Sequence, residues 1–155
     1  MIIIIFVFIV FLFFYLNKPE NCDVDQRLIH SFNKYLEESK HNWNYILPAE
    51  LHDMDTKNVF ILDVRKPEDY KKGHIKGSTN IFWLDLMKPE NLKKIPMDKE
   101  VIIVCYVGHT SSQVVVLLRL LGYNAKVLKF GMGKSPNLNV PVAGWLNYGF
   151  EIVND

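Results

Sequence analysis

Short β-prone runs alternate with helical segments along most of the chain, and this alternation restricts the possible folds more than any other feature. Val59–Leu62 and Val101–Val104 are continuous apolar runs of the kind found in strands that are buried on both faces. Thr79–Ile81 and Ala125–Phe130 are two further candidate strands. Because strands separated by helices pair in parallel, the sequence predicts an α/β fold of three layers with a central parallel sheet of about five strands.

The helical segments between these runs have recognisable ends. Pro67–Lys72 begins with proline, which a helix accepts in its first turn, and it stops at Gly73. Ser111–Leu121 begins with hydroxyl residues that cap helices and stops at Gly122. Its centre is apolar on nearly all sides, which suits a helix buried against the sheet. Val142–Tyr148 is predicted to form a closing helix.

The first sixteen residues, Met1–Leu16, are apolar without exception. In lipid such a segment forms a helix, because a helix satisfies every backbone polar group internally. At about 1.5 Å per residue it reaches about 24 Å, short of the roughly 30 Å hydrocarbon core of a bilayer. This length is typical of a signal anchor or a signal peptide. No small-residue cleavage site occurs in Asn17–Asn21, so we favour an uncleaved anchor over a cleaved signal or a buried core segment.

We therefore expect a protein that is anchored in a membrane through residues 1–16, or one that is exported. Lys18 and Arg27 come after the apolar segment, and the positive-inside rule then favours a cytoplasmic domain. Apolar N-terminal segments of this kind, however, commonly direct the export of the domain behind them. The side of the membrane therefore stays open.

Residues 17–41 are predicted to form a polar linker and an amphipathic helix. Within Gln26–Ser39 the apolar side chains recur with helical spacing on one face: Leu28, Ile29, Phe32, Tyr35 and Leu36. The other face carries both acids and bases, so we expect this helix to dock on the globular domain rather than lie on a membrane surface. Residues 42–155 are predicted to form that domain.

Charge and cysteine content exclude several classes of protein. The 18 basic and 17 acidic residues leave a formal charge of +1, so nothing indicates a nucleic-acid partner. Two cysteines are too few for a disulfide scaffold. Zinc takes four ligands, and Cys105 and His109 have no second pair of ligands at a suitable spacing, so we predict no metal site.

Cys105 is the candidate nucleophile. It comes directly after the buried run Val101–Val104, and open α/β sheets place their sites at the carboxyl ends of such strands. Gly108 permits the loop to curl before the next helix begins, and such a curl turns successive backbone N–H groups inward. Together with the helix N-terminus, these groups favour an anion and stabilise the thiolate, which is the reactive form of cysteine.

The loop lacks the cation that a phosphate group needs. Cysteine phosphatases use a similar loop but place an arginine six residues after the cysteine, where it grips phosphate in bidentate fashion. Here that position is Ser111, and no lysine or arginine lies between Cys105 and Ser112. The loop therefore suits a smaller or less charged group, such as a persulfide sulfur.

This loop resembles that of rhodanese-type sulfurtransferases, closest to the single-domain kind with a C-Y-x-G-x-[ST]-S loop. A second stretch, Leu62–Ile81, is similar to the family pattern D-V-R-x-x-x-E-[YF]-x-x-G-H-I-x-G-A-x-N-I, with Asp69 for the glutamate and Ser78 for the alanine. The two motifs occur in the expected order, and the resemblance covers about Tyr45 to Ile152. It implies the rhodanese-like variant of the α/β fold.

The last part of the domain departs from the family pattern. A G-G-x-x-x-W turn usually comes after the final strand, whereas this chain has Phe130–Pro136 and places Trp145 only later. The departing turn also supplies Lys134, the nearest candidate cation for a bound thiosulfate.

The resemblance implies a sulfurtransferase. Cys105 would take a sulfane sulfur from thiosulfate or a similar donor as a persulfide, and then pass it to a thiol, to cyanide or to an acceptor protein. The resemblance implies no cofactor. It assigns substrate binding to the loop, and Lys134 is added as the candidate cation: Tyr106, Val107, Gly108, His109, Thr110, Ser111 and Lys134.

The second motif is expected to contribute structure rather than chemistry, through Asp63, Arg65, Asp69 and His74. Asp63 and Arg65, at the end of a strand, should form an ion pair, and His74 should pack and hydrogen-bond within a turn. His109 could adjust donor binding with pH, since histidine titrates near neutrality, or it could simply face solvent.

One other function is compatible with these motifs: a non-catalytic rhodanese-like module that binds a partner protein at the membrane. The uncharged loop and the altered turn motivate it. Cys22 lies in the linker, where it could resolve a Cys105 persulfide, pair with another chain, or have no role. We favour no role.

Overall fold

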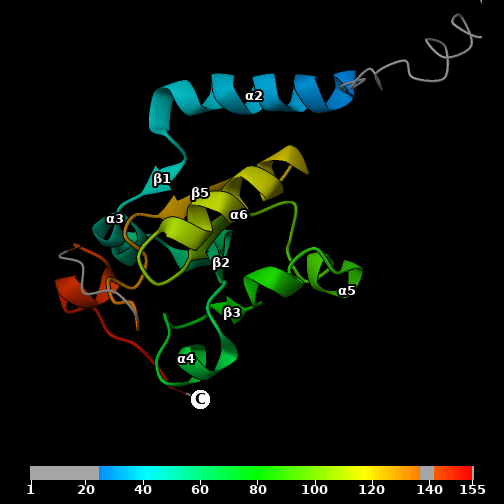
Figure 1. The fold of residues 1–155 in the computed structure, drawn as a ribbon. Helices are drawn as coiled ribbons and strands as arrows, with labels where there is room; N and C mark the ends of the chain where they lie inside the picture. The colour runs from blue at the N-terminus through cyan, green and yellow to red at the C-terminus, as the bar shows by residue number, and fades with distance from the viewer. Residues whose placement is uncertain (1–24, 137–141, 155) are drawn as a thin grey trace, which may run out of the picture.

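The computed structural model describes residues 25–136 and 142–154. Its centre is a sheet of five strands in the order β1-β5-β4-β2-β3, and every neighbouring pair is parallel (Figure 1). The strands are β1 Tyr45–Ile46, β2 Val59–Asp63, β3 Thr79–Asn80, β4 Glu100–Val104 and β5 Ala125–Leu128. The predicted α/β fold with a five-stranded parallel sheet is confirmed.

The predicted membrane segment, residues 1–16, lies outside the described residues, as do most of the linker and Cys22. Among the helices of the described ranges, none combines the length and the apolar character needed to cross a membrane.

The central strand β4 shows how the sheet separates two apolar cores. Successive side chains of a strand point to opposite faces, and all four apolar residues of β4 are fully buried. Helix α6, His109–Leu120, covers one face, where it packs Val114, Val115 and Leu118 over Val101 and Ile103. Helix α3, Pro48–Asp53, and the 3₁₀ turn η3, Trp145–Tyr148, belong to the other face, where Leu51 and Trp145 pack with Ile102 and Val104.

Helix α2, Gln26–Asn42, lies across the outer side of α6 (Figure 1). The Glu38 carboxylate forms an ion pair with the Arg119 guanidinium of α6. The expected docking on the domain therefore occurs, but it leaves much of the apolar face of α2 accessible. Four of its side chains are 37–58% exposed: Leu28, Ile29, Phe32 and Leu36.

The remaining elements are short and connect the strands. They are η1 Thr56–Asn58, α4 Pro67–Lys71, η2 Trp83–Asp85 and α5 Pro89–Leu92. Helix α4 begins at proline and has its last residue just before Lys72, close to the prediction, whereas α6 begins at His109, two residues earlier than predicted.

Two boundaries predicted near the C-terminus are wrong. The last strand stops at Leu128 instead of Phe130, because Phe130 adopts φ 61° and turns the chain away from the sheet. The predicted closing helix Val142–Tyr148 contains only the single 3₁₀ turn Trp145–Tyr148. The Asn147 side chain accepts the Gly144 N–H at 3.0 Å, and Gly149 ends the turn at φ 74°.

Candidate active site

The loop after β4 surrounds the sulfur of Cys105. The Gly108 N–H donates to Sγ at 3.1 Å, and the Ser111 hydroxyl lies 3.2 Å from Sγ. Gly108 has φ 98°, a backbone conformation that glycine adopts without strain, and this curl turns its N–H toward the sulfur. Cys105 itself is only 1% exposed, so the candidate nucleophile lies beneath the surface of the loop.

Ser111 has one hydroxyl hydrogen and two acceptors within reach. Its Oγ lies 3.0 Å from the Gly108 carbonyl oxygen as well as 3.2 Å from Sγ. The same carbonyl also accepts from the hydroxyl of Ser112 at 2.8 Å and from its N–H at 3.0 Å. The Gly108 carbonyl oxygen therefore still has both Ser112 donors when the Ser111 hydroxyl turns to the sulfur. A protonated thiol can donate to Ser111, and a thiolate can accept from it, without any change in the backbone.

The turn after β5 packs tightly against this loop. Met132 N–H donates to the Cys105 carbonyl oxygen at 2.9 Å, and Gly133 N–H donates to that of Tyr106 at 2.9 Å. A Cβ on Gly131 would lie 2.2 Å from the Cys105 carbonyl oxygen, so only glycine permits this approach. Trp145, although it comes later than in the family pattern, returns to the turn through an N–H bond of 2.9 Å to the Gly131 carbonyl oxygen.

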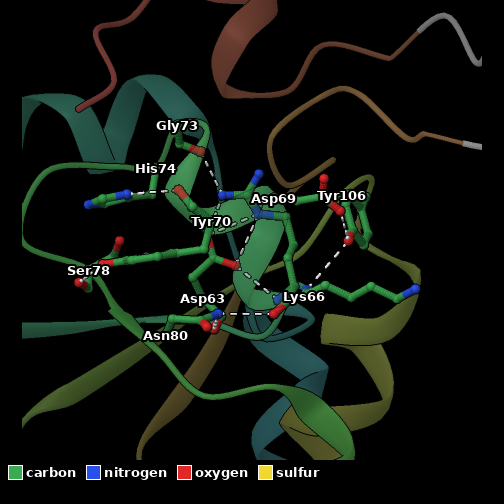
Figure 2. A network of polar contacts seen from close by, with 10 residues as sticks. Asp63, Lys66, Asp69, Tyr70, Gly73, His74, Ser78, Asn80 and Tyr106 are labelled. Atoms are coloured by element: carbon green, nitrogen blue, oxygen red, sulfur yellow. Dashed lines mark hydrogen bonds and ion pairs between the residues drawn. The ribbon is translucent and has the colours of Figure 1, made fainter. Parts of the chain in front are cut away.

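A buried ion pair ends strand β2 (Figure 2). Arg65 Nη2 lies 2.6 Å from Asp63 Oδ2, and Arg65 Nε lies 3.0 Å from both carboxylate oxygens. Arg65 Nη2 also donates to the Gly73 carbonyl oxygen at 2.9 Å. The Asn80 amide donates to the carbonyl oxygens of Asp63 and Arg65 at 2.9 and 3.0 Å. The expected ion pair forms, and Arg65 ties the end of β2 to Gly73, just after α4, while the Asn80 amide ties β3 to the backbone at the end of β2.

His74 lies in the turn that this ion pair supports. Its ring stacks on that of Tyr70 with 3.7 Å between centroids, and its Nδ1 lies 3.0 Å from the Tyr70 carbonyl oxygen. Its backbone pairs with Val153 in an antiparallel bridge. This is the packing and hydrogen-bonding environment expected for it.

A hydrogen bond joins the active loop to α4. The Tyr106 hydroxyl donates to Asp69 Oδ2 at 2.6 Å (Figure 2), and Lys72 Nζ lies 3.1 Å from Asp69 Oδ1. The Tyr106 bond, helped by Lys72, lowers the pKa of Asp69 below its ordinary value. Burial, and after it the bond to Asp69, raises the pKa of Tyr106 to about 12. The sequence motifs place Asp69 among the structural residues and Tyr106 among the substrate-binding residues, and they do not pair the two.

A family model for the rhodanese-like domain matches residues 47–134, a range that contains both sequence motifs. The chain belongs to the rhodanese-like domain family. This conclusion agrees with the parallel sheet and with the placement of the cysteine after its central strand.

Solved structures share the fold of this rhodanese-like domain. A rhodanese-related protein from Thermoplasma volcanium aligns with a TM-score of 0.60 and 27% identity, over 72% of this chain and 99% of that one. A rhodanese-like domain protein from Staphylococcus aureus aligns at 0.54 and 28%, over 64% and 99%. A thiosulfate sulfurtransferase from Pseudomonas aeruginosa aligns at 0.58 over 72% of this chain and 19% of that one, and at 18% identity it shows the fold alone. The comparison with curated proteins finds no match.

Two cavities flank the loop of the rhodanese-like domain and divide its predicted substrate-binding residues. Tyr106 and Lys134 line a cavity of about 350 Å³ next to α4. Val107, Gly108 and His109 line another, of about 280 Å³, next to β1 and β5. The three remaining candidates line neither cavity: Cys105, Thr110 and Ser111.

Alkaline titration of the tyrosines should reveal the Tyr106 bond. One tyrosine of the wild type is expected to ionise only at about pH 12, and Tyr106→Phe should remove that late phenolate absorbance. Because the folded pKa lies above the ordinary value of 10.0, Tyr106 stabilises the fold below pH 10.0 and loses this contribution as the pH rises toward 12. Identical titration curves for the two proteins would contradict the assignment.

Proposed function

We propose that this rhodanese-like domain is a sulfurtransferase that carries sulfane sulfur as a persulfide on Cys105. The observation that carries the proposal is the position of Sγ at the carboxyl end of β4, 3.1 Å from the Gly108 N–H and 3.2 Å from the Ser111 hydroxyl. Hydrogen bonds from both donors stabilise an anionic sulfur, and anionic sulfur is the form that both accepts and carries the transferred atom.

The reaction proceeds in two displacements. The Cys105 thiolate attacks the outer sulfur of thiosulfate, the donor S–S bond breaks, and sulfite leaves with the electron pair. A thiolate or cyanide then attacks the outer sulfur of the persulfide, and the electron pair of the broken S–S bond returns to Cys105. One sulfur atom passes from the donor to the acceptor, so the atoms and electrons balance without a redox cofactor. The acceptor thiol can belong to a small molecule or to a protein.

A direct assay tests this function. Purified protein mixed with thiosulfate and cyanide is expected to form thiocyanate at a rate proportional to protein concentration. Absence of thiocyanate, together with absence of any persulfide after treatment with several sulfane donors, would refute the proposal.

Ser111→Ala is expected to slow transfer about tenfold to hundredfold, because it removes a hydrogen bond to an anion, worth about 1.5–3 kcal/mol. Ser112→Ala is the matched control, since the Ser112 hydroxyl contacts the Gly108 carbonyl oxygen. It should change the rate little. The measurement is the initial rate of thiocyanate formation at saturating donor. Equal rates for the two variants would contradict the role given to Ser111.

The burial of Cys105 favours one competing function, a non-catalytic module that binds a partner protein. A thiol that is 1% exposed meets a donor only when the loop admits one. If Cys105→Ala left the cellular phenotype and partner binding intact, the binding module would be the function.

We also propose that residues 1–16 attach the protein to a membrane or direct its export. The support is the uninterrupted apolar sequence of this segment. The full chain should sediment with membranes and resist an alkaline wash, whereas a chain lacking residues 1–16 should not. Release of the full chain by the wash, with no shortened form in the medium, would contradict both membrane attachment and export.

A further inference from the structure

Helix α2 is amphipathic, and one side of it packs on the domain. Ser31, Tyr35 and Ser39 recur at every fourth residue and are partly buried, so this row marks the docked side. A second row at the same spacing is exposed: Leu28, Phe32 and Leu36. Phe32 and Leu36 each follow a docked residue by one position, and one residue turns a helix by about 100°. This second row, which we call the apolar row, therefore faces away from the docked side.

The N-terminal part of α2 extends beyond the domain. Figure 1 shows α2 continuing past the end of α6, and all of residues 25–30 are exposed. Residues 17–25 connect α2 to Leu16, the last residue of the apolar segment 1–16. The ten residue steps from Leu16 to Gln26 cover at most about 35 Å, even in a fully extended chain. The chain itself thus keeps the start of α2 close to that segment.

A tryptophan follows the last residue of α2. Trp43 is the C-cap of the helix and is 76% exposed, more than any other large apolar side chain among the residues that the structure describes. Tryptophan is enriched at the boundary between membrane and water, where its ring contacts lipid and its N–H finds a polar partner. A helix with leucine and phenylalanine on one side and basic residues on the other is typical of helices that lie in this boundary.

The charges of α2 are balanced. Each of its three lysine and arginine side chains forms an ion pair with an acid of the helix or of its N-cap: Arg27–Asp25, Lys34–Glu38 and Lys40–Glu37. These pairs leave little net charge to attract anionic headgroups. Contact with a bilayer would therefore come from apolar area rather than from charge, and it would need no anionic lipid.

We propose that the apolar row of α2, together with Trp43, lies on the surface of the bilayer into which residues 1–16 insert. This inference rests on the membrane attachment proposed for residues 1–16. A second copy of the chain would also cover such a row, but the short connection to residues 1–16 and the exposed tryptophan favour lipid. Docking on the domain and contact with lipid use different sides of the helix, so the two occur together. Helix α2 thereby fixes the orientation of the rhodanese-like domain at the membrane.

Tryptophan fluorescence in vesicles tests this inference, because residues 1–16 contain no tryptophan. The full chain is reconstituted in phosphatidylcholine vesicles whose acyl chains are brominated near the headgroup, since bromine quenches a neighbouring indole. We expect weaker emission than in vesicles without bromine, and Trp43→Phe should lose most of this quenching. High salt should not change it, because the contact depends on apolar area.

Two further variants separate lipid contact of α2 from insertion of residues 1–16. Phe32→Glu should abolish the quenching, because it places a charge in the apolar row, yet the protein should still resist an alkaline wash. His30→Glu is the matched control, since His30 is exposed and lies about 200° around the helix axis from Phe32. It should keep the quenching. Circular dichroism verifies that both variants remain folded.

The outcomes distinguish the inference from the attachment on which it rests. A wild type that resists the wash but shows no quenching, or quenching that survives Phe32→Glu or Trp43→Phe, would overturn the lipid contact of α2. A dimer that Phe32→Glu converts to monomer, without any quenching by lipid, would overturn it in favour of a second copy. Release of the wild type by the wash would instead refute the attachment through residues 1–16, and this inference with it.

Discussion

Cys105→Ser is expected to abolish sulfur transfer, with a loss of at least about a thousandfold in rate. A serine hydroxyl is a weak nucleophile at neutral pH and cannot carry a persulfide. The replacement fits the site, because a hydroxyl in this position can still accept from the Gly108 N–H and contact Ser111. The measurement is thiocyanate formation from thiosulfate and cyanide.

The fold of this variant needs to be shown alongside its activity. Circular dichroism and the thermal midpoint should match those of the wild type, since the substitution removes little volume from the core. A folded Cys105→Ser protein that transfers sulfur at the wild-type rate would show that another group carries the reaction.

Arg65→Met is expected to lower the free energy of unfolding by about 3–5 kcal/mol, because it leaves a buried carboxylate without its partner. Asp63 is fully buried, and three of its contacts with Arg65 come from the guanidinium group. The Gly73 carbonyl oxygen loses a donor as well. Small domains are stable by about 5–15 kcal/mol, so this loss is a large fraction of the total. Denaturant unfolding of the two proteins measures it.

Lys40→Met is the matched control for that experiment. Lys40 forms an ion pair of 2.6 Å with Glu37, but the two side chains are 61% and 69% exposed. Solvent screens such a pair, and its removal should cost less than about 1 kcal/mol. Equal losses for the two methionine variants would contradict the role of the buried pair.

The elements that the sequence predicts best are those whose signals are local. The run Val101–Val104, Gly108 and the hydroxyl residues of the next helix lie within one short stretch, and they suffice to predict β4, the curled loop and α6. Strand β1 was not predicted, because two residues carry no periodicity. It exists through its pairing with β5, where Tyr45 lies opposite Val127.

In the candidate active site, too, the contacts between sequence neighbours could be predicted, and those between distant residues could not. The Asp63–Arg65 pair could be expected, since the two residues are neighbours at a strand end. The Tyr106–Asp69 bond joins residues 37 positions apart and depends on the way α4 packs beside the loop. Its only trace in the sequence is the replacement of the family glutamate by Asp69. The burial of Cys105 depends on the turn at Gly131, which no local pattern places against the loop.

The most direct test of persulfide formation on Cys105 is the mass of the intact protein after incubation with thiosulfate and removal of the excess. We predict a gain of one sulfur atom, located by peptide mapping on Cys105, lost on addition of a thiol and absent from Cys105→Ser. A wild-type protein that gains no sulfur from any sulfane donor, or gains it on Cys22 instead, would contradict a persulfide carried by Cys105.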